Sequence, residues 1–255
     1  MPYLTAAGHR LEYEQIHAHQ AAAPCLVFLH EGLGSVAMWR DFPLRLCTAV
    51  GCRGLVYSRY GYGKSDPLAA PHSVDFMHDE GRHALPGLLD QLHIARPILF
   101  GHSDGGSIAL LHAGLTTRPV MAVIVMAPHV LVEDISIRSI EAARVTYATT
   151  DLREKLRRYH DDPGSAFRGW NDIWLHPDFR SWNIEDALPG IHVPVLAIQG
   201  EDDEYGTMTQ IELIAQGAVN AEVELLKLAD CGHSPHKDQP EVVIAAVQRL
   251  VARLA

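Results

Sequence analysis

Short runs of apolar residues recur along this chain of 255 residues, and they constrain its fold more than any other feature. The runs are continuous rather than alternating, which is typical of parallel strands covered by helices on both faces. Helical patterns lie between them, so the sequence predicts an α/β fold with a doubly wound, mostly parallel sheet. The predicted strands are Cys25–Leu29, Gly54–Tyr57, Pro97–Phe100, Ala122–Met126, Pro194–Ile198 and Val223–Leu228, preceded by a hairpin over Tyr3–Ile16.

The alternation of strands and helices is interrupted between residues 130 and 188. This segment has helical patterns without a strand-like run, and it contains three of the four tryptophans. We therefore predict a body formed by residues 1–129 and 189–255 and a helical cap, or lid, formed by residues 130–188. Trp170 and Trp174 of the lid, with Leu33 of the body, are predicted to bind substrate. The alternative is that Trp170, Trp174 and Trp182 only anchor the insertion to the body.

Composition and charge exclude several classes of function. The net charge is −10 and no basic stripe is present, which argues against a nucleic-acid partner. No apolar run is long enough to cross a bilayer, and the first residues show no secretory signal, so we expect a cytoplasmic enzyme without a membrane partner. The 16 histidines show no metal-ligand spacing, so no metal is expected. The expected partner is a small-molecule substrate, and a homodimer is left open.

The segment Gly101-His102-Ser103-Asp104-Gly105 carries the strongest chemical signal. It follows a predicted strand and precedes a helix predicted over Gly106–Leu115. A strand, then G-x-S-x-G, then a helix is the pattern of a nucleophile elbow, in which a tight turn exposes a serine at a helix N-terminus. Ser103 is therefore the predicted nucleophile.

A serine hydroxyl needs a base to take its proton, and the base needs an orienting carboxylate. His233, on the loop after the last predicted strand, is the predicted base, with His236 as the alternative. Asp203, after the strand that ends at Ile198, is the predicted carboxylate. Its alternatives are Asp202 and, less favoured, the acids Glu133 and Asp134.

The oxyanion of an acyl-transfer intermediate needs backbone N–H donors. The first predicted donor is the amide of Asp104, the residue after the nucleophile. The second lies in the glycine-containing loop after the first long strand, where we predict Gly32, with Leu33 as the alternative.

Taken in chain order, these motifs resemble those of the α/β-hydrolase family over nearly the whole chain. The matching segments are the elbow Gly101–Gly105, the HGxxG-like loop His30–Gly34, the RGxGxS-like loop Tyr60–Ser65, the GxxD-like loop Gly200–Asp203 and the GH pair Gly232-His233. The helical insertion resembles the cap of that family. The resemblance implies the fold far more specifically than the substrate.

Two positions depart from the family pattern. Glu31 stands where relatives have glycine in the oxyanion loop. Asp104 stands where an uncharged residue is common, and its carboxylate is expected either to point to solvent or cap the helix, or to pair with a cationic group of the substrate.

These features predict a serine hydrolase that cleaves a small carboxylic ester through an acyl-enzyme intermediate and needs no cofactor. The same residues could also cleave a thioester, an amide or a C–C bond. A lyase, a cofactor-free oxygenase and a non-catalytic ligand-binding protein of the same fold are the alternatives from other classes.

Overall fold

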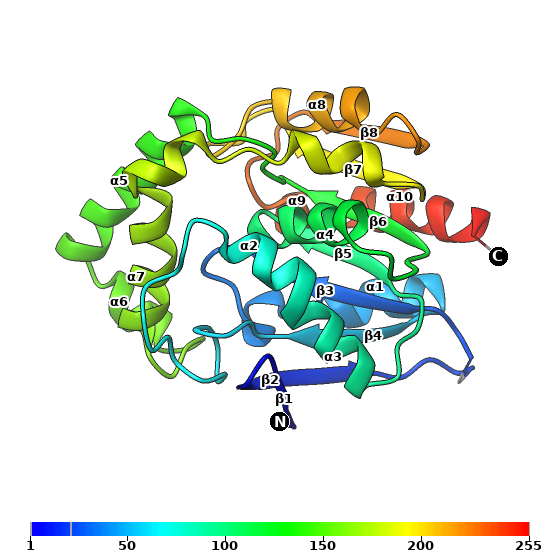
Figure 1. Cartoon of the computed structure of the whole chain (residues 1–255), viewed down its shortest axis with the longest axis horizontal. Coiled ribbons are helices and arrows are strands. Elements are labelled where there is room, and N and C mark those ends of the chain that lie inside the picture. The colour runs from blue at the N-terminus through cyan, green and yellow to red at the C-terminus, as the bar shows by residue number, and fades with distance from the viewer. Residues whose placement is uncertain (1, 21, 255) are drawn as a thin grey trace.

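The computed structural model describes residues 2–20 and 22–254; residues 1, 21 and 255 of the predicted body lie outside the described residues. Within that part of the chain, eight strands form one sheet in the order β1-β2-β4-β3-β5-β6-β7-β8 (Figure 1). The β1–β2 and β2–β4 pairs are antiparallel, and the other neighbours are parallel. The strands are β1 (Tyr3–Ala6), β2 (His9–Ile16), β3 (Cys25–Leu29), β4 (Arg53–Tyr57), β5 (Ile98–His102), β6 (Ala122–Met126), β7 (Val195–Gly200) and β8 (Val223–Leu228). The predicted fold class is confirmed.

Continuous apolar sequence produces the buried strands because both faces of the sheet are covered. Every residue of β3, β5, β6 and β7 is buried. Successive side chains point to opposite faces, so each strand contributes to two cores. In β3, Val27 packs in the core on one face and Phe28 in the core on the other.

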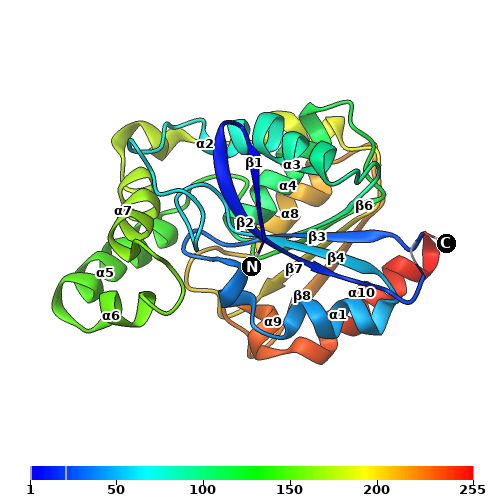
Figure 2. The same cartoon turned by 90° about the horizontal axis from the view of Figure 1, so that it is seen from below.

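Helices from both ends of the chain cover the two faces of the sheet, as Figure 2 shows from below. One layer contains the helices α1 (Phe42–Val50), α9 (Pro235–Asp238) and α10 (Pro240–Arg253), with the short 3-10 turn η1 (Val36–Trp39). The other layer contains α2 (Phe76–Asp79), the π-helical turn η2 (Glu80–Ala84), α3 (Leu85–Gln91), α4 (Asp104–Leu115) and α8 (Thr209–Gly217). In α10 the buried residues Val243, Val247 and Leu250 recur at helical spacing, which gives the helix one apolar face.

The segment between β6 and β7 forms a separate group of helices beside the sheet (Figures 1 and 2). It contains α5 (Asp134–Thr149), α6 (Leu152–Leu156), α7 (Pro163–Trp174) and the 3-10 turn η3 (Pro177–Ser181). The 3-10 turn η4 (Glu185–Gly190), which follows, packs on α4 and α8 of the body. We call residues 130–188 the insertion; its status as a separate cap domain stays a prediction. No helix within residues 2–20 and 22–254 has the length and apolar character needed to span a membrane.

The turn between β5 and α4 depends on glycine at position 105. A Cβ atom there would lie 2.1 Å from the carbonyl oxygen of Leu29, so α4 approaches β3 as closely as two backbones can. The helix begins at Asp104, two residues earlier than predicted, because the chain enters it directly from Ser103. This contact holds α4 against the centre of the sheet.

We expect Gly105→Ala to lower the free energy of unfolding by more than about 2 kcal/mol, because backbone atoms would have to move to admit the methyl group. Gly87→Ala is the matched control: Gly87 also lies in a helix, and the nearest atom to its added Cβ, on Ala6, is 3.8 Å away. That variant should be neutral or stabilised by up to about 1 kcal/mol. Urea unfolding of both variants gives the comparison. Equal stabilities would contradict this account of the turn.

Candidate active site

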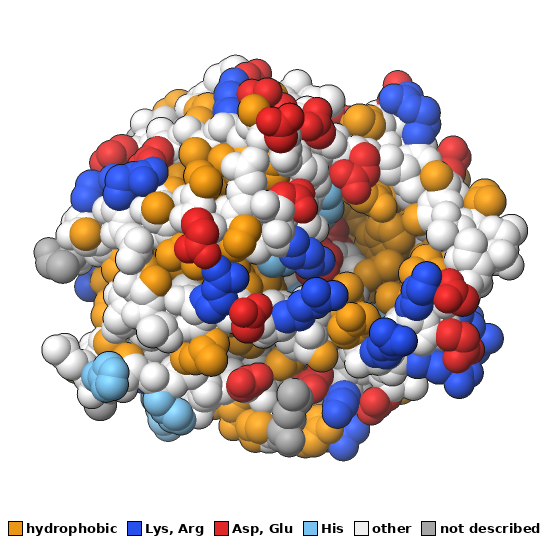
Figure 3. All heavy atoms as spheres, turned by 180° about the vertical axis from the view of Figure 1, so that it is seen from behind, with side chains coloured by type: hydrophobic (Ala, Val, Ile, Leu, Met, Phe, Trp, Pro, Cys, Tyr) orange, Lys and Arg blue, Asp and Glu red, His pale blue; other side chains and the backbone are white. Residues whose placement is uncertain are grey.

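A cavity of about 120 Å³ lies at the carboxyl ends of the parallel strands, between the body and the insertion. Loops that follow β3, β5, β6, β7 and β8 contribute to its wall, and α5 and α7 close it from the other side. Figure 3 shows, on the side of the insertion, a hollow whose wall is formed by hydrophobic side chains. The cavity is lined by Glu31, Gly32, Leu33, Ser103, His129, Ile140, Trp170, Trp174, Tyr205 and His233.

Ser103 lies at the floor of this cavity in a strained backbone conformation. Its φ of 52° and ψ of −121° fall where residues with a side chain rarely occur. The turn is held by the Ser103 N–H, which donates to the Met126 carbonyl at 2.9 Å. The side chain therefore stands at the N-terminus of α4, where the helix dipole favours negative charge.

His233 and Asp203 form a hydrogen-bonded pair beside the cavity. The Nδ1 of His233 is 2.8 Å and 2.9 Å from the two carboxylate oxygens of Asp203. Because a carboxylate only accepts, Nδ1 carries the proton and donates it, which leaves Nε2 unprotonated in the neutral ring. Asp203 also accepts from the Tyr205 N–H at 2.8 Å and from the Gln199 side-chain amide at 2.7 Å.

The two groups shift each other's proton affinity in opposite directions. Burial disfavours the charged imidazole, but the Asp203 charge and hydrogen bond outweigh burial and raise the pKa of His233. For Asp203, burial acts to raise the pKa, but the charge of His233 and the hydrogen bonds lower it below its usual range. Asp203 therefore stays ionised at neutral pH.

The alternative base, His236, packs away from the cavity. It is buried against the rings of Trp39 and Phe42, at centroid distances of 5.0 Å and 5.4 Å. Burial lowers the pKa of His236 to about 2. It fills a core position rather than the candidate site.

The alternative acids also lie elsewhere. Asp202 is exposed, and Asp134 lies at the exposed start of α5, where it pairs with Arg180. Glu133 accepts from the Thr207 N–H at 2.8 Å and from the Gln210 side chain at 2.7 Å, so it ties two loops together. Among the four predicted acids, only Asp203 is hydrogen-bonded to the His233 ring.

The predicted oxyanion donors belong to the first turn of α4 and to the loop after β3. The amide of Asp104 is the first N–H of α4, which no carbonyl of the helix can reach. Gly32 and Leu33 both line the cavity, and neither amide has an acceptor among residues 2–20 and 22–254. The structure therefore leaves both predicted loop donors available and does not separate them.

The Asp104 side chain neither points to solvent nor caps the helix, so that expectation is wrong, while pairing with a substrate cation stays a prediction. Its carboxylate is fully buried, makes no helix cap, and accepts from the Trp174 Nε1–H at 3.1 Å. Arg59, also buried, lies with its Nη2 atom 3.7 Å from the carboxylate. Burial raises the pKa of Asp104, and the Arg59 charge and the Trp174 hydrogen bond oppose that rise. A substrate cation would find this position already occupied by Arg59.

Residues 26–246 match the model of the "Alpha/beta hydrolase family". The chain belongs to the alpha/beta hydrolase family. It is 34% identical over 211 residues to the "sn-1-specific diacylglycerol lipase ABHD11" of Danio rerio; the match covers 83% of this chain and 61% of the lipase, so the chain spans less than two thirds of that relative.

Solved structures share the fold of this family member at low sequence identity. The enol-lactonase from Burkholderia xenovorans LB400 superimposes with a TM-score of 0.78 at 21% identity, covering 98% of this chain and 100% of the lactonase. A structure from a study of carboxylesterases of Nitrososphaera gargenis superimposes with a TM-score of 0.80 at 19% identity. The match covers 99% of this chain and 98% of the chain in that structure.

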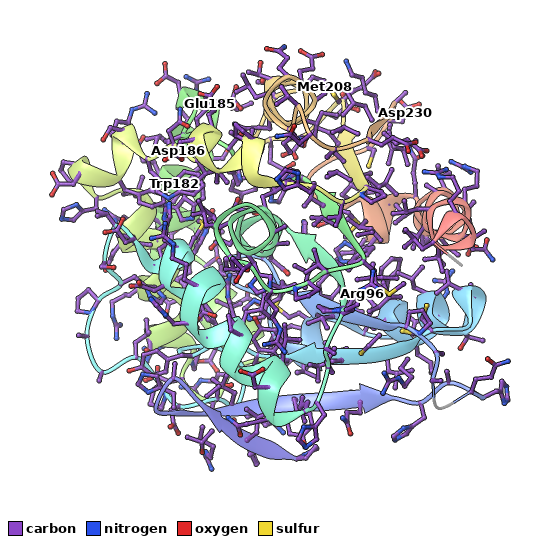
Figure 4. The ribbon with its side chains drawn as sticks, turned by 45° about the vertical axis from the view of Figure 1, so that its right-hand side comes forward. Arg96, Trp182, Glu185, Asp186, Met208 and Asp230 are labelled. Atoms are coloured by element: carbon purple, nitrogen blue, oxygen red, sulfur yellow. The ribbon has the colours of Figure 1, made fainter. Side chains whose placement is uncertain are left out.

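Each residue of the insertion that was predicted to bind substrate lines the cavity. Trp170 and Trp174 do so from α7, together with Leu33 from the body. Trp182, labelled in Figure 4, lies between η3 and η4 and does not line it. Its ring stacks on Phe179 at a centroid distance of 5.3 Å. Trp182 therefore packs against another residue of the insertion, and its anchoring role stays a prediction.

Sequence reasoning did not predict four of the residues that line the cavity, which are Glu31, His129, Ile140 and Tyr205. Glu31 was singled out only as a departure from the family pattern. His129 follows β6, and burial lowers its pKa to about 3, so it is neutral. Tyr205 packs its ring 4.7 Å from the ring of His233. The signal that could have found His129 and Tyr205 is their position, because both follow the carboxyl ends of parallel strands.

We expect NMR titration of the His233 imidazole to give a pKa above the usual value of about 6.5. Asp203→Asn should lower it, because the variant removes the charge that favours the imidazolium while burial remains. Asp202→Asn removes a charge from the neighbouring, exposed position and is the matched control, with little expected change. A His233 pKa that responds equally to both variants would refute the pairing as its cause.

Proposed function

We propose that this hydrolase cleaves small carboxylic esters, with Ser103 as nucleophile, His233 as base and Asp203 as orienting carboxylate. One observation carries the proposal: Ser103 and His233 line the same small cavity while His233 Nδ1 donates to the buried Asp203. The esterase class is supported by the diacylglycerol lipase named among its relatives.

In the proposed reaction, the Nε2 of His233 takes the Ser103 proton as Oγ attacks the ester carbonyl carbon. The carbonyl oxygen becomes an oxyanion, to which the amides of Asp104 and Gly32 donate. When the tetrahedral intermediate collapses, the C–O bond to the alcohol breaks, and His233 returns the proton to that oxygen. A water molecule, activated by the same imidazole, then attacks the acyl-enzyme and releases the acid and free Ser103.

The wall of the cavity supports a short, uncharged acyl group. Sites for drug-sized ligands occupy roughly 300–1,000 Å³, whereas this cavity has about 120 Å³. Ile140 and Trp170, both buried, form apolar parts of its wall. Glu31 lines the same space, and the pKa of its carboxyl stays well below its usual range because His102 outweighs the effect of burial. A carboxylate on the substrate would therefore be repelled by Glu31.

Ser103→Ala should abolish hydrolysis of p-nitrophenyl acetate, because no other group in the cavity is placed to form the acyl-enzyme. It should also abolish covalent labelling by a fluorophosphonate probe. Ser73→Ala, which changes an exposed serine before α2, is the control and should retain both signals. Persistent turnover in the folded Ser103→Ala protein would refute the proposed nucleophile.

Wild-type protein should prefer p-nitrophenyl acetate or butyrate over the octanoate by at least about tenfold in kcat/KM, since longer chains exceed the cavity. Ile140→Ala should shift that ratio toward octanoate by enlarging the wall. Val145→Ala, on the exposed side of the same helix, is the matched control. An unchanged octanoate-to-acetate ratio in Ile140→Ala would show that the acyl chain lies elsewhere.

A further inference from the structure

Arg59 is a buried cation beside the candidate site that the proposed reaction does not yet use. Its side chain is 1% exposed, and it directly follows β4 and Ser58 in the chain. Its guanidinium carbon lies 5.2 Å from the ring centre of Tyr62, so one face is covered by an aromatic side chain. Burying a guanidinium costs several kcal/mol unless it is paired, so its contacts need an explanation.

The first contact fixes the peptide unit between Glu31 and Gly32. Arg59 Nη2 donates to the Glu31 carbonyl oxygen at 3.0 Å. The carbonyl and N–H of a trans peptide lie in one plane and point in opposite directions. Arg59 therefore binds the carbonyl end of the Glu31–Gly32 peptide, and the Gly32 N–H is the other end of the same planar peptide. Holding the carbonyl sets the direction in which the Gly32 N–H points.

Two further donors reach the same carbonyl: the Gly34 N–H, at 3.0 Å, and the His30 ring. The backbone N–H of Arg59 donates to His30 Nε2 at 3.0 Å, which leaves the ring proton on Nδ1. His30 Nδ1 then donates to the Glu31 carbonyl oxygen at 2.6 Å. Burial, together with the Arg59 charge, holds the pKa of His30 well below its usual range, so this tautomer persists at neutral pH. Donors on a carbonyl polarise the peptide and strengthen its N–H as a donor.

The second contact of Arg59 reaches the other candidate donor. The guanidinium lies 3.7 Å from the carboxylate of Asp104, whose own amide begins α4. Without a cation nearby, this buried carboxylate would oppose the formation of an oxyanion at Ser103. One side chain thus contacts both the loop that carries Gly32 and the residue that begins α4.

We infer that Arg59 is a positioning residue that holds the Gly32 and Asp104 amides in the geometry and charge state needed to bind an oxyanion. The inference rests on the proposed function. It assigns to Arg59 a role beyond neutralising Asp104, because the contact with the Glu31 carbonyl does not depend on that carboxylate.

The test compares Arg59→Met, Asp104→Asn and the double variant Arg59→Met/Asp104→Asn, with active sites counted by the fluorophosphonate probe. Arg59→Met should lower kcat for p-nitrophenyl acetate by about 10- to 100-fold and change KM by less than about twofold, because the oxyanion forms only after binding. The double variant should stay as low as Arg59→Met, since the Asp104→Asn change does not restore the donor to Glu31. Arg53→Met, at the start of β4, is the matched control and should retain wild-type kcat.

Inhibition by butylboronic acid gives a readout that a purely structural role would not change. Its tetrahedral adduct with serine places an oxygen in the same position, so its affinity should fall by the same factor as kcat/KM. If Arg59→Met fails to fold, the double variant still carries the test, because it leaves neither buried charge unpaired.

Recovery of the double variant to the Asp104→Asn level would overturn the inference and reduce Arg59 to a counterion. Full activity and boronate affinity in Arg59→Met would overturn it as well. Either outcome requires an active wild type and leaves the proposed function intact. A wild-type protein with neither turnover nor labelling at Ser103 would instead refute the proposed function itself.

Discussion

The contact between α4 and β3 is the constraint on which the candidate site depends. With no room for a side chain at Gly105, the helix lies against the centre of the sheet and the chain must turn at Ser103 with φ of 52°. Because β5 lies between β3 and β6, the loops after these strands end beside the serine. The loops after β7 and β8 bring Asp203 and His233 to the same edge. A parallel sheet thus collects residues from distant parts of the chain at one edge.

The electrostatics of the site follow from this crowding. Glu31, Asp104 and Asp203 all lie near Ser103. During acyl transfer, a negatively charged oxyanion would form beside this serine. Each of the three acids has a nitrogen-bearing side chain beside it: His102 Nδ1 lies 3.5 Å from Glu31, while Arg59 faces Asp104 and His233 faces Asp203. The acids thus help to order the loops, and their partners limit the field that they would otherwise impose on an oxyanion.

Motif order predicted the fold, because local sequence encodes strands, turns and the elbow. In the structure, the predicted residues Ser103 and His233 line one cavity, and Asp203 pairs with His233. Motif order could not predict the surroundings of Asp104. Whether that carboxylate meets solvent, substrate or Arg59 depends on how the loop after β4 and helix α7 pack over α4, which no local pattern specifies. His129 and Tyr205 follow the ends of predicted strands, but nothing local shows that their side chains reach the cavity. The positions of charges and rings depended on tertiary packing, whereas the positions of strands did not.

The insertion is joined to the body at the candidate site itself. Trp174 donates to the Asp104 carboxylate, and His160, just before α7, bonds through Nε2 to the Leu33 carbonyl at 2.9 Å. A Cβ atom on Gly32 would lie 2.1 Å from the Trp170 ring, so α7 also packs directly on the oxyanion loop. A movement that lifted α7 as a rigid body would break the Trp174–Asp104 hydrogen bond and separate Trp170 from Gly32. Access to Ser103 and the order of the oxyanion loop are therefore coupled, because the same helix controls both.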